Sequence, residues 1–152
     1  MENIEYRRIN KELERMIAAE FGSWVTVYSC LHSGPNCFAL AAVKDKKPIG
    51  FISYYAKFFQ NRKHAFIDII QVHEDFRHMH IASAMLKRAE QQAAQDGFQQ
   101  IYGWSSDDKK AAINMWLQAD YTVCPAAMHG ESLDKDSMGK PIYGVYAAKL
   151  LK

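Results

Sequence analysis

One stretch, residues 66–97, constrains the fold more than any other part of this chain. Its first part, FIDIIQV, is a short apolar and β-branched run broken only by Asp68, which is typical of a buried strand. Its last part, IASAMLKRAEQQAAQDG, has apolar residues such as Ile81 and Met85 at helical spacing and ends at Gly97, a stop signal. The stretch therefore predicts a strand that leads into an amphipathic helix. Because the first N–H groups of a helix have no partner within it, this junction also predicts an anion site.

Periodic patterns elsewhere predict further strands and helices. Short apolar or alternating runs indicate strands over residues 4–9, 37–43, 49–57, 66–72, 99–104, 121–128 and 142–151. Apolar residues at helical spacing indicate helices over residues 10–21, from residue 81 to the glycine at 97, and over residues 109–119. Asn10 is a suitable N-cap for the first helix, and Gly22 closes it.

The connections between these elements decide the fold class. Residues 44–48 separate two apolar runs and predict a β-hairpin whose turn is longer than two residues. Residues 60–63 are expected to form a polar loop, and residues 105–108 to cap the last helix. Two strand–helix units in succession favour parallel pairing of strands 66–72 and 99–104 through a right-handed crossover. A hairpin followed by such units predicts an α/β fold with one mixed sheet (α+β).

Length and composition limit the possible classes of protein. With 152 residues, 49% hydrophobic and 24% charged, the chain is expected to form a single domain over residues 1–152. A net charge of +2 is too small to indicate nucleic-acid binding. Three cysteines without CxxC spacing indicate reduced thiols. No apolar run approaches the roughly 18 residues of a membrane span. The N-terminus also lacks the apolar stretch of a signal peptide, so we expect a cytoplasmic protein without membrane contact.

The segment VHEDFRHMHIASAML, residues 72–86, resembles the acyl-CoA-binding segment of the GCN5-related N-acetyltransferase (GNAT) family. That family shows the pattern V-x-P-x-x-R-G-x-G-x-G/A before an apolar helix. The positions of the motif and of its helix are occupied here by Val72, Arg77, Ile81, Ala82 and Leu86. His78 and His80 stand where the family most often has glycines.

A second segment, KAAINMWLQADY, is similar to the family's N-x-x-A-x-x-x-Y-x-x-x-G-F helix. Ala112 and Ile113 fit the pattern, whereas Trp116 replaces its tyrosine. Its asparagine, glycine and phenylalanine are replaced by Lys109, Asp120 and Tyr121. The predicted order of elements also matches that of the family. The resemblance implies a GNAT-like acyl-CoA N-acyltransferase fold, with a central mixed, mostly antiparallel sheet flanked by helices.

The resemblance further implies an activity and a cofactor. We expect an N-acetyltransferase that transfers an acetyl group from acetyl-CoA to a primary amine of a small molecule or peptide. A helix start with a cationic side chain suits the pyrophosphate of coenzyme A. The residues expected to bind it are Arg77, His78, Met79, His80, Ile81, Ala82 and Ser83. The pantetheine is expected along the main chain of Ile70, Gln71 and Val72, and Trp116 packs either on the cofactor or in the core.

Two residues are candidate general bases. Asp68 is the one charge in an otherwise apolar strand, and burial raises the pKa of a carboxyl toward the range of a proton acceptor. It could equally face water or be paired structurally. His73, at the end of the strand, is the second candidate. A proton donor could come from Tyr121, Tyr143 or Tyr146, or be dispensable because a thiolate is a tolerable leaving group.

Other readings of the same residues stay open. Arg77 could pair with Glu74 or Asp75 rather than with a phosphate. The His-x-His spacing at 78–80, together with His73, could suggest a metal site. No cysteine or carboxylate cluster completes such a site, so no metal is expected.

Alternatives to catalysis also remain. The chain could be a non-catalytic acyl-CoA-binding or protein-interaction module on the same fold, or an unrelated α+β binding domain. The aromatic pairs at 54–55 and 58–59, if exposed, suggest a homodimer contact or a wall of the acceptor site, and they are equally compatible with the core. Loops that bind the acceptor amine are expected over residues 22–36, 57–65 and 128–141.

Overall fold

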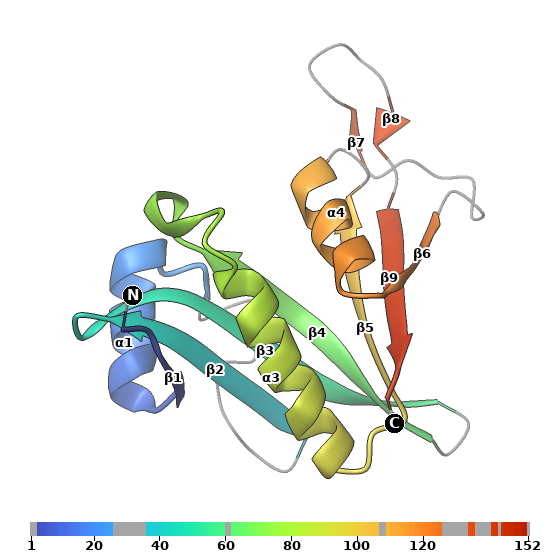
Figure 1. The fold of residues 1–152 in the computed structure, drawn as a ribbon, viewed down its shortest axis with the longest axis horizontal. Coiled ribbons are helices and arrows are strands. Elements are labelled where there is room, and N and C mark those ends of the chain that lie inside the picture. Colours follow the sequence, from blue (N-terminus) through green and yellow to red (C-terminus); the bar gives the residue numbers. More distant parts are fainter. Residues whose placement is uncertain are drawn as a thin grey trace.

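The computed structural model of this protein describes residues 3–25, 36–59, 62–106, 109–125, 134–135, 141–142 and 144–151. Within these residues a seven-stranded sheet has the order β1-β2-β3-β4-β5-β9-β6, and a separate two-stranded ladder joins β7 and β8 (Figure 1). Neighbouring strands of the large sheet are antiparallel except β4 and β5, which are parallel. The prediction of a mixed, mostly antiparallel sheet flanked by helices is confirmed.

Each predicted strand and helix has a counterpart among the described residues. The strands are β1 (Glu5–Arg8), β2 (Cys37–Lys44), β3 (Lys47–Phe59), β4 (Arg62–Val72), β5 (Gln100–Ser106), β6 (Thr122–Pro125), β7 (Asp134–Lys135), β8 (Pro141–Ile142) and β9 (Gly144–Leu150). The helices are α1 (Lys11–Phe21), α3 (Ile81–Gln95) and α4 (Lys110–Gln118), with a single 3₁₀ turn, η1 (Glu74–Phe76). Among them, no helix has the length and apolar character needed to cross a membrane.

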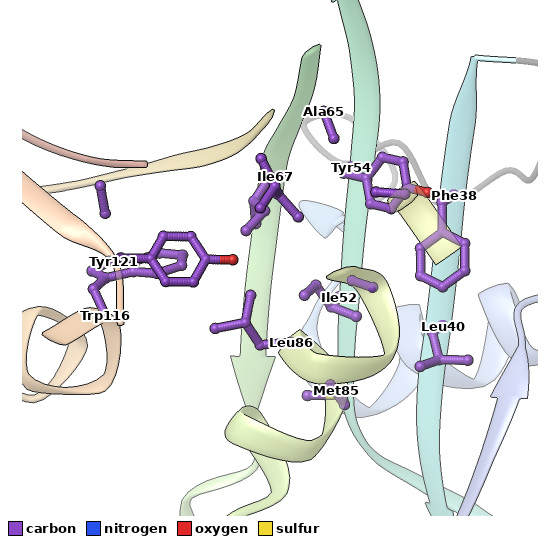
Figure 2. Packing of buried hydrophobic residues seen from close by; sticks show 14 of the residues in the cluster. Phe38, Leu40, Ile52, Tyr54, Ala65, Ile67, Met85, Leu86, Trp116 and Tyr121 are labelled. Carbon is purple, nitrogen blue, oxygen red and sulfur yellow. The ribbon is translucent and has the colours of Figure 1, made fainter. Parts of the chain in front are cut away.

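Two buried clusters lie on opposite faces of the sheet. The larger cluster joins Met85 of α3 and Trp116 of α4 to one face (Figure 2). The smaller cluster joins Ile17 of α1 to the other face. Each helix buries one apolar stripe in this way, as amphipathic periodicity requires. Helices α3 and α4 therefore lie on the same side of the sheet, and α1 lies on the opposite side.

The first helix begins where its sequence predicts. The side chain of Asn10 accepts a hydrogen bond of 2.9 Å from the main-chain N–H of Leu13, which is the N-cap arrangement. Gly22, with φ of 116°, follows the last helical residue, and its N–H donates to the carbonyl of Ala18. The predicted helix over residues 10–21 is confirmed.

The hairpin turn between β2 and β3 is shorter than predicted. Lys44 pairs with Lys47, so only Asp45 and Lys46 form the turn, with φ of 50° and 65°. Two successive positive φ values characterise the two-residue turns that match the twist of a hairpin. The predicted turn over 44–48 is therefore wrong. Pro48 is instead accommodated within β3 beside a register shift, where a missing N–H is tolerated.

Strand β4 also begins earlier than predicted. Its cross-strand pairs with β3 extend down to Phe59–Arg62, so residues 57–65 are mostly strand rather than acceptor loop. Two lysines here have a structural role, because their ammonium groups lie over aromatic rings. The ammonium of Lys57 lies 4.4 Å from the centroid of Phe66, and that of Lys63 lies 4.3 Å from the centroid of Phe98.

The predicted exposure of the neighbouring aromatic residues is only partly correct. Tyr54 is 1% exposed and stacks on Phe38 with ring centroids 4.9 Å apart (Figure 2). Tyr55 is half-buried and meets Phe66 edge-on. Phe58 is exposed, as predicted. Tyr54 is therefore part of the core and not of a contact surface.

The parallel pairing of β4 with β5 is confirmed but short. It covers three pairs and ends at Phe66–Tyr102, after which the two strands diverge (Figure 1). Near this point Ser53 pairs with Ile69 while Tyr54 pairs with Ile67, which leaves Asp68 as the extra residue of a β-bulge. A bulge bends its strand and increases its twist. The lone charge of the predicted strand thus lies where β4 turns away from β5.

Half of the capping segment predicted for helix α4 belongs to a strand instead. Ser105 and Ser106 belong to β5, residues 107–108 lie outside the described residues, and Lys109 provides no side-chain cap. The helix is held instead by Trp116, whose Nε1 donates a 3.1 Å hydrogen bond to Ser105 Oγ. Glycine at position 103 makes room for this indole, since a Cβ there would lie 2.7 Å from Trp116 Cη2.

Candidate active site

A pocket of about 470 Å³ lies where β4 and β5 have diverged. Its walls are the last residues of β4, the turn that follows, the first turn of α3 and one side of α4. The lining residues are Ile70, Gln71, Val72, Phe76, Arg77, His78, His80, Ile81, Ala82, Ser83, Ala111, Ala112, Asn114, Met115 and Gln118. The predicted cofactor residues all belong to this lining except Met79 and Trp116.

The turn before α3 has the backbone of a glycine-rich loop without its glycines. His78 and His80 have φ of 66° and 61°, in the left-handed region that glycine favours. His80 is also the N-cap residue of α3, and no side chain caps the helix there. The first N–H groups of α3, at residues 81–83, are therefore available at the pocket. Unpaired N–H groups and the helix dipole make this turn suitable for an anion.

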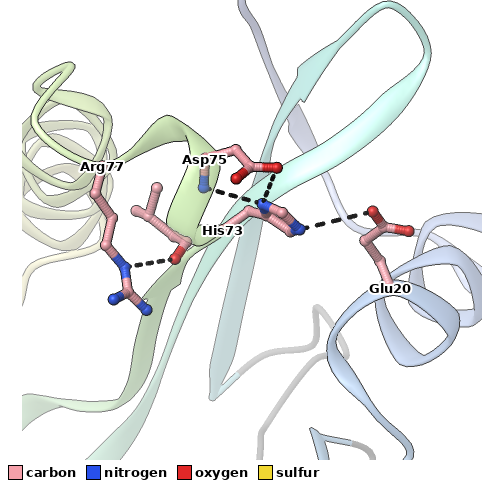
Figure 3. A network of polar contacts seen from close by, with 5 residues as sticks. Glu20, His73, Asp75 and Arg77 are labelled. Carbon is pink, nitrogen blue, oxygen red and sulfur yellow. Dashed lines mark hydrogen bonds and ion pairs between the residues drawn. The ribbon is translucent and has the colours of Figure 1, made fainter.

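Arg77 adds a permanent positive charge to the pocket. Its Nε donates a 3.4 Å hydrogen bond to the main-chain carbonyl of Val72, at the end of β4 (Figure 3). Among the described residues it forms no ion pair with Glu74 or Asp75, so that alternative is not realised. The guanidinium is exposed and lines the same pocket as the first turn of α3.

The side chain of His73 is directed away from this pocket, toward α1. Its Nδ1 accepts a 3.2 Å hydrogen bond from the N–H of Asp75, and its Nε2 lies 4.0 Å from a carboxylate oxygen of Glu20 (Figure 3). Its ring packs edge-on against Phe21 and Phe76. His73 lines a separate cavity of about 270 Å³ near the β2–β3 turn.

Asp68 and the tyrosines occupy different surroundings. Asp68 is half-buried at the bulge of β4 and does not line the pocket. The Tyr121 hydroxyl donates a 2.9 Å hydrogen bond to Glu90, which also accepts from Lys149 at 2.9 Å. Burial, with Glu90 adding to it, raises the pKa of Tyr121 far above its usual range, so this phenol is a poor proton donor. Tyr146 lies on the other face of the sheet, and residue 143 lies outside the described residues.

The described residues hold no group of three histidine, cysteine, aspartate or glutamate side chains arranged to bind a metal. His73 faces α1 while His78 and His80 line the pocket, so these histidines do not converge.

The Acetyltransferase (GNAT) family profile matches residues 5–121, the part of the chain from β1 to just beyond α4. The chain belongs to this family. No curated protein sequence matches it.

Solved GNAT structures share its fold at low sequence identity. Arabidopsis thaliana NAA60 in complex with a bisubstrate analogue superposes with a TM-score of 0.72 at 14% identity, covering 99% of each chain. A GNAT acetyltransferase from Streptococcus pneumoniae superposes with a TM-score of 0.74 at 14% identity, covering 98% of this chain and 100% of the other. The ribosomal-protein-S18-alanine N-acetyltransferase from Escherichia coli gives 0.71 at 11% identity, covering 99% and 95%.

In this GNAT chain the sequence analysis missed the contribution of α4 to the pocket. Ala111, Asn114, Met115 and Gln118 line it, a set spaced by three or four residues and hence on one side of the helix. Leu117, on a different side of α4, is 53% exposed. The mixed polar and apolar spacing was a usable signal, yet it does not distinguish a pocket wall from a solvent face.

Proposed function

We propose that this GNAT protein transfers an acetyl group from acetyl-CoA to a primary amine of a small molecule or peptide. The observation that carries the proposal is the pocket at the β4–β5 divergence, which ends at the uncapped first turn of α3. Related folds support the cofactor, because NAA60 was solved with acetyl-CoA. The name of the Escherichia coli neighbour supports an amine acceptor.

The cofactor would bind in two parts. Its pyrophosphate would lie at the N–H groups of residues 81–83, with Arg77 beside it and the two histidines of the turn around it. Its pantetheine would run along Ile70, Gln71 and Val72. The β4–β5 ladder ends at Phe66, so the main chain of this part of β4 is available on the side facing the pocket. Met79 and Trp116 have no part in this arrangement, because neither lines the pocket.

Acetyl transfer requires a neutral amine nitrogen to attack the thioester carbonyl carbon. The C–N bond then forms, the C–S bond breaks, and coenzyme A leaves as a thiolate. The proton released by the amine needs an acceptor, for which we propose Asp68. Its place at the bulge, two residues beyond the last β4–β5 pair, supports this role better than that of His73, whose ring faces α1. A thiolate is a tolerable leaving group, so no protein acid is assigned.

Titration calorimetry with acetyl-CoA tests the cofactor site. We expect micromolar binding by the wild type and about tenfold weaker binding by Arg77→Ala, since a hydrogen bond to a charged group contributes about 1.5–3 kcal/mol. Arg15→Ala is a matched control, because Arg15 is exposed on α1 and does not line the pocket. Absence of binding by the wild type would reject acetyl-CoA as the cofactor.

Turnover separates an enzyme from a binding module. One departure from the family pattern favours the non-catalytic alternative. Trp116 occupies the tyrosine position, is buried, and donates its indole N–H to Ser105. Release of free coenzyme A thiol in the presence of amines would establish transfer. Binding of acetyl-CoA without thiol release across a broad amine panel would establish the module instead.

A further inference from the structure

An aromatic surface lies on the face of the sheet that α3 and α4 do not cover. Gly103 and Ser105 of β5 face Trp116 of α4, so the alternate residues Tyr102 and Trp104 point to the opposite face. Trp104 is directly opposite Tyr146 of β9, and directly opposed residues of two strands share a face. These two rings are 42% and 44% exposed, respectively.

The same surface continues onto β4 and β3. The ring of Phe66 lies 4.8 Å from that of Tyr102, and 5.4 Å from that of Tyr55, between centroids. Phe66–Tyr102 is also the last pair of the β4–β5 ladder. The rings of Phe66 and Tyr102 therefore lie where the two strands begin to diverge. Trp104 and Tyr146 lie beyond this point, where β5 is no longer paired with β4.

This position suits the approach of an acceptor. On its own face of the sheet, the cofactor pocket has α3 and α4 as walls. An amine that attacks an acyl group held there needs a route that the cofactor does not occupy. In the complex that we envisage, the amine would cross the sheet beyond Phe66–Tyr102, where β4 and β5 are no longer paired. A molecule seated on Trp104 and Tyr146 would have its amino group directed toward the thioester.

The charges around the rings indicate which acceptor fits. The ammonium of Lys57 lies 4.4 Å from the centroid of Phe66 and 5.7 Å from that of Tyr55, so a cation already lies over these two rings of the surface. A second cationic group on the acceptor would meet a like charge. The exposed indole and phenol instead suit an uncharged planar group, which aromatic rings bind by offset or edge-on stacking.

We propose that Trp104 and Tyr146 form an acceptor subsite that holds the ring of an aromatic primary amine while its amino group reaches the thioester. This subsite rests on the proposed acetyltransferase function. It defines the acceptor as an arylalkyl amine, in contrast to an aliphatic polyamine, by stacking at the exposed face of β5 and β9.

The experiment titrates 2-phenylethylamine into protein saturated with coenzyme A, which gives a non-reacting ternary complex. Trp104→Ala and Tyr146→Ala are expected to weaken its binding about fivefold or more through lost stacking, whereas Tyr146→Phe, which keeps the ring, binds like the wild type. Leu150→Ala is the matched control, because Leu150 lies on the same face of β9 and is 78% exposed. It pairs with Gln100, on the side of the ladder away from the divergence. Coenzyme A affinity, measured first, is expected to be the same in every variant.

Each alternative outcome has a distinct meaning. Equal affinity for 2-phenylethylamine in the wild type and both alanine variants overturns the subsite while leaving acetyl-CoA binding intact. Tighter binding of 1,4-diaminobutane than of 2-phenylethylamine overturns the aromatic specificity. A wild-type dimer that Trp104→Ala or Tyr146→Ala dissociates, with unchanged amine affinity, makes this face a contact between two copies of the chain. Failure of the wild type to bind coenzyme A rejects the proposed function and the subsite with it.

Discussion

His78 and His80 hold a backbone conformation that glycine adopts most easily. Both have positive φ, and both lie at the turn that presents the first N–H groups of α3 to the pocket. The turn therefore preserves the geometry that an anion site requires while carrying side chains that restrict access to it. The two imidazole side chains also add polar groups to the pocket lining.

Strain at this turn can be measured by paired substitutions of one histidine. We expect His78→Gly to be about 1 kcal/mol more stable than His78→Ala, because only the glycine variant relieves the left-handed backbone. Urea unfolding of the two variants gives the difference directly. Equal stability of the glycine and alanine variants would show that the turn is not strained.

Tyr54 contributes to stability in a manner that depends on pH. Burial, with a smaller effect of Asp96, raises the pKa of Tyr54 above its usual range. In the unfolded chain tyrosine ionises near pH 10. The unfolded state therefore loses this proton first as pH rises. The stability that the protonated Tyr54 side chain contributes to the fold is fully present below about pH 10 and decreases above it.

Tyr54→Phe is expected to remove this part of the alkaline loss of stability. The Tyr54 hydroxyl is buried and finds no hydrogen-bond partner among the described residues, so we expect no destabilisation near pH 7. Free energies of unfolding in urea between pH 8 and 11 would show a shallower decline than in the wild type. Tyr55→Phe, at the neighbouring half-buried position, is the control. A decline as steep as that of the wild type would contradict the assignment.

At the scale of elements, the divergence of β4 from β5 organises the site. The bulge at Asp68 turns β4, the ladder ends at Phe66–Tyr102, and α4 is held against β5 by Trp116. Contact between an indole and a glycine backbone fixes the distance between α4 and the sheet. The wall that α4 gives the pocket thus depends on a packing contact outside it.

Gly103→Ala tests that dependence. Its Cβ would lie 2.7 Å from Trp116 Cη2, so the helix or the indole must shift. We expect a loss of about 1–3 kcal/mol in stability, as for overpacked cores, together with weaker acetyl-CoA binding. Urea unfolding and calorimetry measure the two effects.

Trp116→Phe supplies the compensating change, because the smaller ring lacks the atoms that clash. The double variant Gly103→Ala/Trp116→Phe is expected to lose less unfolding free energy than the two single variants lose in sum. Additive losses would mean that the contact does not position α4.

At the scale of the whole molecule, the described residues form two cores on opposite faces of the seven-stranded sheet, and the pocket lies at the edge of the larger core. Its walls come from β4, α3 and α4, which are separate in sequence. A ligand that contacts all three binds only the folded chain and therefore stabilises it.

Acetyl-CoA is accordingly expected to raise the melting temperature. At about 100 times its dissociation constant it would add about 2.7 kcal/mol, which corresponds to about 5–10 °C for a chain of this size. Thermal unfolding with and without acetyl-CoA checks this, and Arg77→Ala at the same concentration should show a smaller shift. An unchanged melting temperature in the wild type would contradict binding to the folded state.

Local signals in the sequence were sufficient for the elements and for half of the pocket. The Asn10 cap, the apolar spacing of α3 and the strand–helix junction before it depend on residues close in the chain, so they are readable without tertiary structure. The segment from Val72 to Ser83 was identified by its resemblance to the acyl-CoA-binding motif of the GNAT family.

Tertiary structure decided where the remaining groups face. The two-residue turn at Asp45–Lys46, the burial of Tyr54 and the orientation of His73 toward α1 follow from packing between distant segments. The joint surface of Trp104 and Tyr146 follows from strand register, which no local pattern reveals. Periodicity determines which residues share a side of one element, but only the packed chain determines what that side meets.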